Sequence, residues 1–117
     1  MTADLVLRNV TLPTGRCADI VVAGGLVRHV GRAVRAEETI DCSRLTCLPG
    51  AVDMHVHMRG GVQAGKEDWR TGTLSAVAGG VTVVVDQPNT VPPITTPDLL
   101  RARVREAKEQ AVCGFAV

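Results

Sequence analysis

The feature that most constrains the fold is a continuous apolar run, VTVVV, at residues 81–85 of the 117-residue sequence. β-Branched side chains favour strands, and a strand that is apolar on both faces is typical of a parallel sheet covered on both sides. Short apolar runs at residues 51–56 and 114–117 predict two neighbouring strands. Helical patterns lie between these runs, so the order of elements predicts an α/β fold with parallel strands.

Each expected helix carries its own start and stop signals. The first is expected over residues 66–78, with acidic residues in its first turn and two glycines after its end. The second follows Thr95 or Thr96 as a cap, and Pro97 suits its first turn. Apolar stripes at helical spacing predict the buried faces, which are Trp69, Thr73 and Val77 in the first helix and Leu100, Val104, Ala107 and Ala111 in the second.

The amino-terminal part of the chain is predicted to form short antiparallel strands. Gly24 and Gly25 separate two apolar runs and predict a hairpin, because such a tight turn needs positive φ at its centre. Residues 1–48 are predicted to form part of a small β-sandwich, and residues 49–117 the first βα units of a barrel. A complete (β/α)8 TIM-type barrel needs about 250 residues. The strands of the first part are expected at residues 4–10, 18–23, 26–30, 39–40 and 45–48.

Composition narrows the classes of function. Hydrophobic residues make up 45% and charged residues 21%, which is typical of a globular chain. The net charge is +1, and the only aromatic residues are Trp69 and Phe115, so a nucleic-acid or anionic-membrane partner is not expected. No apolar run approaches the ~20 residues that span a bilayer, and no leader peptide is apparent, so the expected location is the cytoplasm.

Two histidines, His55 and His57, come at the end of the first barrel strand. Side chains alternate along a strand, so both imidazoles are expected on one face. At the C-terminal end of a barrel strand that face looks into the region where α/β barrels place their chemistry. Neutral imidazole is a good zinc ligand, so the pair predicts a metal site. Spacing alone also allows two polar strand-end residues that face solvent.

The stretch around these histidines resembles the dihydroorotase branch of the amidohydrolase superfamily. The resemblance covers residues 48–96 closely and the preceding strands more loosely. It departs from the family pattern at Gly60 and Gly61, where relatives often have Glu-Pro, and at Gly65, where many have His. The matching segments are LPGAVDMHVHMR at residues 48–59, KED at 66–68, TGT at 71–73, AGGVT at 78–82 and DQPNT at 86–90.

The resemblance implies roles for four residues. His55 and His57 would be ligands of a centre with one or two zinc ions. Arg59 and Asn89 would bind the carboxylate of a small-molecule substrate, since a guanidinium fork and an amide donor suit that group. The implied reaction is the interconversion of L-dihydroorotate and N-carbamoyl-L-aspartate in pyrimidine biosynthesis.

No catalytic residue is expected within this chain. The family needs a bridging Lys or Asp ligand, two further histidines and an acid–base Asp, all from later strands. The third histidine here, His29, precedes the motif and is interpreted as structural. The 117-residue chain alone is therefore expected to be an inactive, amino-terminal part of a larger enzyme. Asp53 and Asp86 could orient the metal ligands by hydrogen bonds to them, or could serve only as helix caps or in hydrogen bonds within loops.

Two other interpretations stay open. The first is a related cyclic amidohydrolase, either a hydantoinase/dihydropyrimidinase or an allantoinase, which would generally lack the combination of Arg59 with Pro88, Asn89 and Thr90. The second is a non-catalytic homologue that acts through a partner such as aspartate carbamoyltransferase. The sequence leaves open the number and identity of the metals. It also leaves open the oligomeric state, for which a homo-oligomer is one option.

Overall fold

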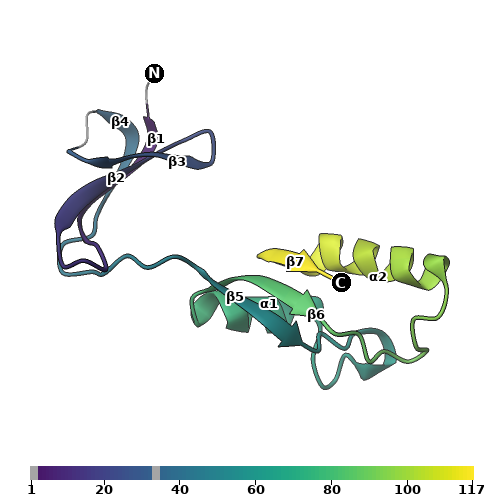
Figure 1. Ribbon diagram of the computed structural model, residues 1–117. Coiled ribbons are helices and arrows are strands. Elements are labelled where there is room, and N and C mark those ends of the chain that lie inside the picture. Colours follow the sequence, from purple (N-terminus) through teal and green to yellow (C-terminus); the bar gives the residue numbers. More distant parts are fainter. Residues whose placement is uncertain (1–2, 33–34) are drawn as a thin grey trace. The chain divides into compact units, whose positions relative to one another are not determined.

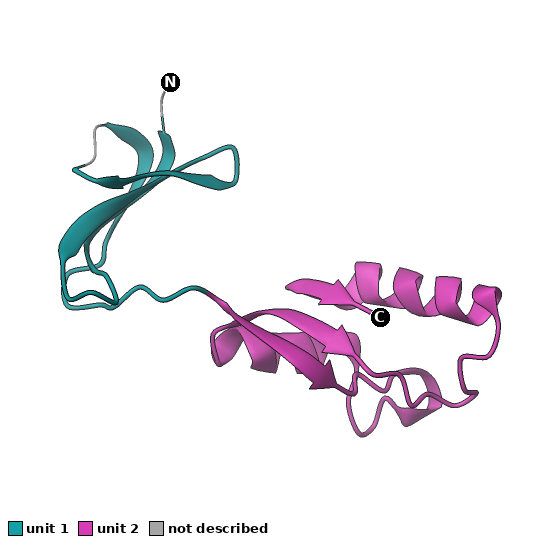
Figure 2. Ribbon diagram, in the orientation of Figure 1, with its two compact units in different colours: residues 1–49 teal, residues 50–117 magenta. Residues whose placement is uncertain are grey.

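The computed structural model describes residues 3–32 and 35–117. The chain divides into two compact units, residues 1–49 and residues 50–117, shown in different colours in Figure 2. The second unit contains both histidines of the candidate site. Among the described residues, no helix has the length and apolar character needed to cross a bilayer.

The first unit is built on a four-stranded sheet with the strand order β3-β2-β1-β4 (Figure 1). Gly24 and Gly25, at φ 60° and 71°, join β2 to β3 and confirm the predicted hairpin. β1 pairs with β2 in antiparallel fashion, as predicted, but it pairs with β4 in parallel fashion, so the antiparallel prediction is wrong for this pair. The strands are β1 Ala3–Thr11, β2 Cys17–Ala23, β3 Leu26–Gly31 and β4 Ala36–Asp41.

The strand predicted over residues 45–48 is wrong. This segment makes one isolated bridge, from Thr46 to Thr11, and is otherwise irregular chain. Leu45 and Leu48 are both exposed in the structure. The apolar residues thus meet the end of β1 at a single residue, and the pairing does not extend into a strand.

The second unit is a three-stranded parallel sheet, ordered β5-β6-β7, which confirms the predicted α/β fold. The β-branched run lies in the central strand, where Val84 is fully buried. Its core packs against Trp69 of α1 and Ala107 of α2, so both helices share one hydrophobic cluster with the sheet. The elements are β5 Ala51–Val56, η1 Gly61–Gln63, α1 Trp69–Ala78, β6 Val81–Asp86, α2 Pro97–Gln110 and β7 Gly114–Ala116.

Helix α1 begins three residues later than predicted, at Trp69 instead of Lys66. Asp68 is its N-cap, and its side chain accepts a hydrogen bond of 2.7 Å from the Thr71 amide. A side-chain acceptor at this position satisfies an amide that has no partner within the helix, so the helix starts after the acidic pair. Helix α2 begins as predicted, with Thr96 as its cap and Pro97 in its first turn.

The buried faces of the helices differ in part from the predicted stripes. Trp69 and Thr73 are buried in α1, but Val77 is 46% exposed. In α2, Leu100 is 42% exposed, whereas a charged residue, Arg103, is buried beside Ala107. The face of α2 that meets the sheet is therefore partly polar, and this brings α2 into the candidate site.

Candidate metal and substrate site

The two histidines lie side by side at the carboxyl end of β5. His55 is the fifth residue of the six in this strand, and His57 follows its last residue. Their ring centroids are 5.2 Å apart, with an angle of 84° between the ring planes. Both side chains are exposed, so a ligand from solvent could reach them. Period-two alternation thus brings the pair together as the sequence predicted.

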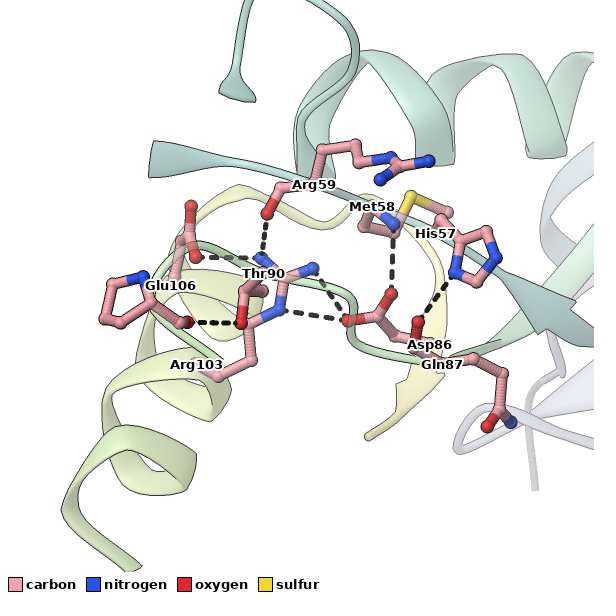
Figure 3. A network of polar contacts seen from close by, with 9 residues as sticks. His57, Met58, Arg59, Asp86, Gln87, Thr90, Arg103 and Glu106 are labelled. Atoms are coloured by element: carbon pink, nitrogen blue, oxygen red, sulfur yellow. Dashed lines mark hydrogen bonds and ion pairs between the residues drawn. The ribbon is translucent and has the colours of Figure 1, made fainter. Parts of the chain in front are cut away.

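A backbone carbonyl fixes the orientation of the His57 ring. Its Nδ1 lies 2.6 Å from the carbonyl oxygen of Gln87, in the loop that follows β6 (Figure 3). A carbonyl oxygen only accepts hydrogen bonds, so Nδ1 carries the proton of the neutral ring. Nε2 then keeps its electron pair. A histidine held in this way by its far nitrogen is typical of metal ligands in proteins.

The sheet brings Gln87 to that position. β5 and β6 are parallel, and Val56 pairs with Asp86 at their carboxyl ends. The Gln87 amide donates a hydrogen bond of 2.8 Å to the Val56 carbonyl, which extends the ladder by one step. The neighbouring carbonyl of Gln87 is therefore available to His57, although the two residues are 30 positions apart.

Of the two aspartates considered from the sequence, only Asp86 is buried. Asp53 is exposed, and its Oδ1 accepts a hydrogen bond of 3.1 Å from the His55 amide. Asp86 Oδ1 accepts a hydrogen bond of 3.0 Å from the Met58 amide, directly after His57. Each carboxylate therefore bonds the backbone of the histidine segment, and neither of these bonds is to an imidazole ring.

Arg59 occupies a left-handed backbone conformation, with φ of 45°. Its side chain is half-buried, and Figure 3 shows the guanidinium turned away from Arg103. It lines a pocket of about 150 Å³ together with Gly60, Thr90 and residues of α2. Asn89 is exposed in the loop between β6 and α2, next to Thr90 of that pocket. Arg59 and the loop that carries Asn89 thus belong to one edge of the sheet.

Sequence reasoning missed Arg103 as a member of this region. Its guanidinium contacts Asp86 and the Arg59 carbonyl, although it lies 44 residues beyond Arg59. A signal was present, since Arg103 is three residues after Leu100 and four before Ala107, within the predicted apolar stripe of α2. A lone charge on a buried helix face needs a partner, and that partner could have been sought.

The donor set fits zinc in kind but is incomplete in number. Imidazole is a common zinc ligand, and the second nitrogen of His57 is already engaged. Among residues 3–32 and 35–117, however, no group of three or more His, Cys, Asp or Glu side chains is arranged to hold a metal ion. Catalytic zinc sites use three protein ligands, so the pair supplies only part of one.

Comparison with known proteins agrees with this geometry. The family described as dihydro-orotase-like matches residues 44–117. The chain belongs to this family. The matched segment contains both histidines, Arg59 and Asn89, so the whole candidate site falls within the dihydro-orotase-like region.

Curated relatives of this dihydro-orotase-like chain are described as dihydroorotases. The protein from Halobacterium salinarum is 41% identical over 113 residues, which cover 96% of this chain and 27% of that protein. The protein from Trichlorobacter lovleyi is 41% identical over 99 residues, which cover 82% of this chain and 23% of that protein. The chain therefore spans about a quarter of the length of the relatives that it matches.

Solved structures place the chain among amidohydrolase barrels. The L-hydantoinase (dihydropyrimidinase) from Arthrobacter aurescens matches with a TM-score of 0.89 and 30% identity, covering 98% of this chain and 27% of that one. The β-aspartyl dipeptidase from Fervidobacterium islandicum matches with a TM-score of 0.67 and 26% identity, covering 98% of this chain and 33% of that one. The chain thus has the fold of the first part of such an enzyme, as the sequence predicted.

Proposed function

We propose that this chain contributes the first metal ligands and the carboxylate-binding residues of a dihydroorotase, which interconverts L-dihydroorotate and N-carbamoyl-L-aspartate in pyrimidine biosynthesis. The observation that carries the proposal is the histidine pair, with His57 Nδ1 bound to the Gln87 carbonyl and Nε2 left with its electron pair. Membership of the dihydro-orotase-like family and the names of the curated relatives support the substrate.

His55 and His57 would hold the zinc. When bound, such an ion supplies a Lewis acid that polarises a ring carbonyl and activates a water molecule. The work of this chain is to present two neutral imidazoles in a fixed orientation. The Gln87 carbonyl holds the proton of neutral His57 on Nδ1, so Nε2 would be the nitrogen that holds the ion.

Arg59 and Asn89 would bind the substrate carboxylate. The guanidinium offers a fork of parallel N–H donors that matches a carboxylate, and the Asn89 amide adds a further donor. Dihydroorotate carries a carboxylate beside its ring, whereas a simple hydantoin ring does not. The presence of both donors at one sheet edge favours the acid substrate.

The active site needs further residues. Two imidazoles leave zinc short of three protein ligands, and the acid–base group that moves the proton to the leaving nitrogen is not among the proposed roles of this chain. We therefore expect the 117 residues alone to be inactive, as part of a larger cytoplasmic enzyme. Exposed Leu26, Val27 and Val30 of β3 offer a surface for a second copy or for aspartate carbamoyltransferase.

A hydantoinase or dihydropyrimidinase is the second candidate. The L-hydantoinase from Arthrobacter aurescens matches 98% of this chain with a TM-score of 0.89, so the backbone suits either activity. The choice depends on Arg59, because a neutral ring gives a half-buried guanidinium no anionic partner.

A chimera tests the proposal and separates the two candidates. This chain would replace the matched segment of the Trichlorobacter lovleyi dihydroorotase, and turnover of L-dihydroorotate, dihydrouracil and hydantoin would be measured with zinc present. We expect turnover of dihydroorotate, loss of it in His57→Ala, and a KM for dihydroorotate at least about tenfold higher in Arg59→Ala, as for loss of a charged hydrogen bond. Arg101→Ala, on the exposed part of α2, is the matched control.

Two outcomes would contradict the proposal. One is a folded chimera that hydrolyses dihydrouracil or hydantoin in preference to dihydroorotate. The other is a folded chimera whose zinc content, measured by metal analysis, is the same in His55→Ala and His57→Ala as in the unmutated chimera. Metal analysis needs a folded chimera but no turnover, so it tests the metal assignment separately from the substrate.

A further inference from the structure

Arg103 of α2 and Asp86 of β6 form a buried ion pair beside the histidine segment (Figure 3). Their side chains are only 4% and 0% exposed. Arg103 Nε and Nη2 donate to the same oxygen, Asp86 Oδ2, at 3.0 and 2.7 Å. The guanidinium also lies 4.7 Å from the centre of the Trp69 ring, which limits its movement. The pair is thus held firmly in place.

Each partner also makes one hydrogen bond to the backbone between His57 and Gly60. Asp86 Oδ1 accepts from the Met58 amide at 3.0 Å. Arg103 Nη1 donates to the Arg59 carbonyl at 2.8 Å. The ion pair therefore holds the backbone of two consecutive residues, Met58 and Arg59. The candidate zinc ligand His57 directly precedes them, and Arg59 is itself the candidate carboxylate ligand.

This backbone needs such support. Arg59 has φ of 45° and Gly60 has φ of 77°, the left-handed region that residues with a Cβ rarely adopt. A Cβ on Gly60 would lie 2.3 Å from Glu106 Oε1 and 3.1 Å from Arg103 Nη1. The side chains of α2 thus close directly against the turn, and Glu106 in turn accepts a hydrogen bond of 3.0 Å from Arg103 Nη1.

We infer that Arg103, paired with Asp86, is a positioning residue that sets the backbone of residues 57–60 and thereby aims His57 and Arg59. The inference rests on the proposed function, in which His57 binds a zinc ion and Arg59 binds the substrate carboxylate. Arg103 acts through the backbone: its guanidinium is buried and already engaged with Asp86, Glu106 and the Arg59 carbonyl.

Amide exchange and zinc binding in the 117-residue chain test this role. Arg103→Met removes the guanidinium but keeps much of its bulk, and Arg101→Met is the matched control on the exposed face of the same helix. We expect Arg103→Met to speed exchange of the Met58 amide about tenfold, as for loss of a charge-supported hydrogen bond. The Gly72 amide, bonded to the Asp68 carbonyl in α1, should not change. The zinc affinity of Arg103→Met should fall together with the faster Met58 exchange. Arg101→Met should change neither the zinc affinity nor the exchange rate.

The results that would overturn the inference are specific. Equal acceleration at Met58 and Gly72 would indicate general stabilisation, and a folded Arg103→Met with unchanged Met58 exchange would exclude positioning. If Arg103→Met does not fold, Arg103→Lys decides, because it keeps the charge beside Asp86 but loses the fork. An unchanged ¹³C shift of the Arg59 carbonyl and unchanged zinc affinity in Arg103→Lys would then contradict the role.

The exchange measurement also separates this inference from the proposed function. It needs neither metal nor substrate, so it reports whether Arg103 holds the turn even in a chain that binds no zinc. Conversely, normal zinc binding with unaltered Met58 exchange in Arg103→Met would leave the proposed function intact and refute the positioning role alone.

Discussion

His57 is the better anchored of the two candidate zinc ligands. Rotation of its ring would break the 2.6 Å hydrogen bond to the Gln87 carbonyl. The ring of His55 contacts that of His57 edge to face, so the anchored His57 ring helps to order the His55 ring. The two imidazoles therefore differ in rigidity, although they are equivalent in the sequence pattern.

Nitrogen NMR of the histidine rings tests this difference. In the 117-residue chain we expect the Nδ1-protonated form to dominate in neutral His57, because the Gln87 carbonyl accepts only from that nitrogen. Added zinc should shift Nε2 of His57 and leave the ring of His29 unchanged. A shift of Nδ1 in place of Nε2, or an equal response of His29, would contradict the proposed site.

Local spacing predicted that His55 and His57 lie together, and the resemblance implied Arg59 and Asn89, but neither predicted the contacts of Gln87 and Arg103. His55 and His57 are two residues apart on one strand, so alternation alone puts them together. The Gln87 contact depends on the pairing of Val56 with Asp86, and the Arg103 contact depends on how α2 packs. Neither depends on spacing, because strand register and helix packing are set by the whole core.

Among the helices, the start of α1 depends most clearly on one side chain. The hydrogen bonds to Asp68 come from the amide and the hydroxyl of Thr71. They hold the pKa of the Asp68 carboxyl below its ordinary value of 3.8, the Thr71 amide being the larger cause. The ionised cap therefore stabilises the folded chain at neutral pH, and its protonation weakens α1.

Acid titration of the unfolding free energy tests the Asp68 cap. Because the folded pKa is depressed, the contribution is complete above pH 3.8, the unfolded value, and is lost as pH falls through the lower folded pKa. Asp68→Asn should flatten the acid limb of the stability curve, measured by urea denaturation between neutral pH and strong acid. Asp98→Asn, in the first turn of α2, is the control. An acid limb as steep as in the unmutated chain would contradict the prediction.

The positions of strands and turns were predicted correctly where the residue types strongly restrict the backbone conformation. The β-branched run and the Gly24–Gly25 turn predicted β6 and the hairpin, since few other conformations suit them. The prediction for residues 45–48 failed because this segment pairs with β1 only at Thr46 and Thr11, where β1 ends. The stripe of α2 failed at Leu100, because packing selected the neighbouring face that contains Arg103.

Seen as a whole, the molecule consists of two small units, each with little core. The first unit buries Ala3, Val6 and Val21 in one cluster and Val10, Ile20 and Cys42 in the other. The second buries one cluster around Trp69 and Val84. Small domains bury a low fraction of their surface and are marginally stable, so the loss of one buried valine should be felt strongly in either unit.

A matched pair of core substitutions tests whether residues 1–48 and 49–117 behave as separate domains, as proposed from the sequence. Val6→Ala and Val84→Ala each remove two methyl groups from a fully buried site, which costs about 2 kcal/mol. Urea denaturation followed by residue-resolved NMR should show each substitution lowering the midpoint of its own unit. Val62→Ala, at an exposed position, should lower neither. A common shift of both midpoints would indicate one cooperative domain.

Trp69 also makes the second unit optically distinct. The chain contains one tryptophan and no tyrosine, so light at the red edge of ultraviolet absorption excites this indole alone. Its ring is fully buried, with Phe115 at 5.3 Å and the cationic head of Arg103 at 4.7 Å. The intrinsic tryptophan fluorescence of the unmodified chain consequently reports on residues 50–117 alone. The charge of Arg103 beside the indole should shift its emission wavelength.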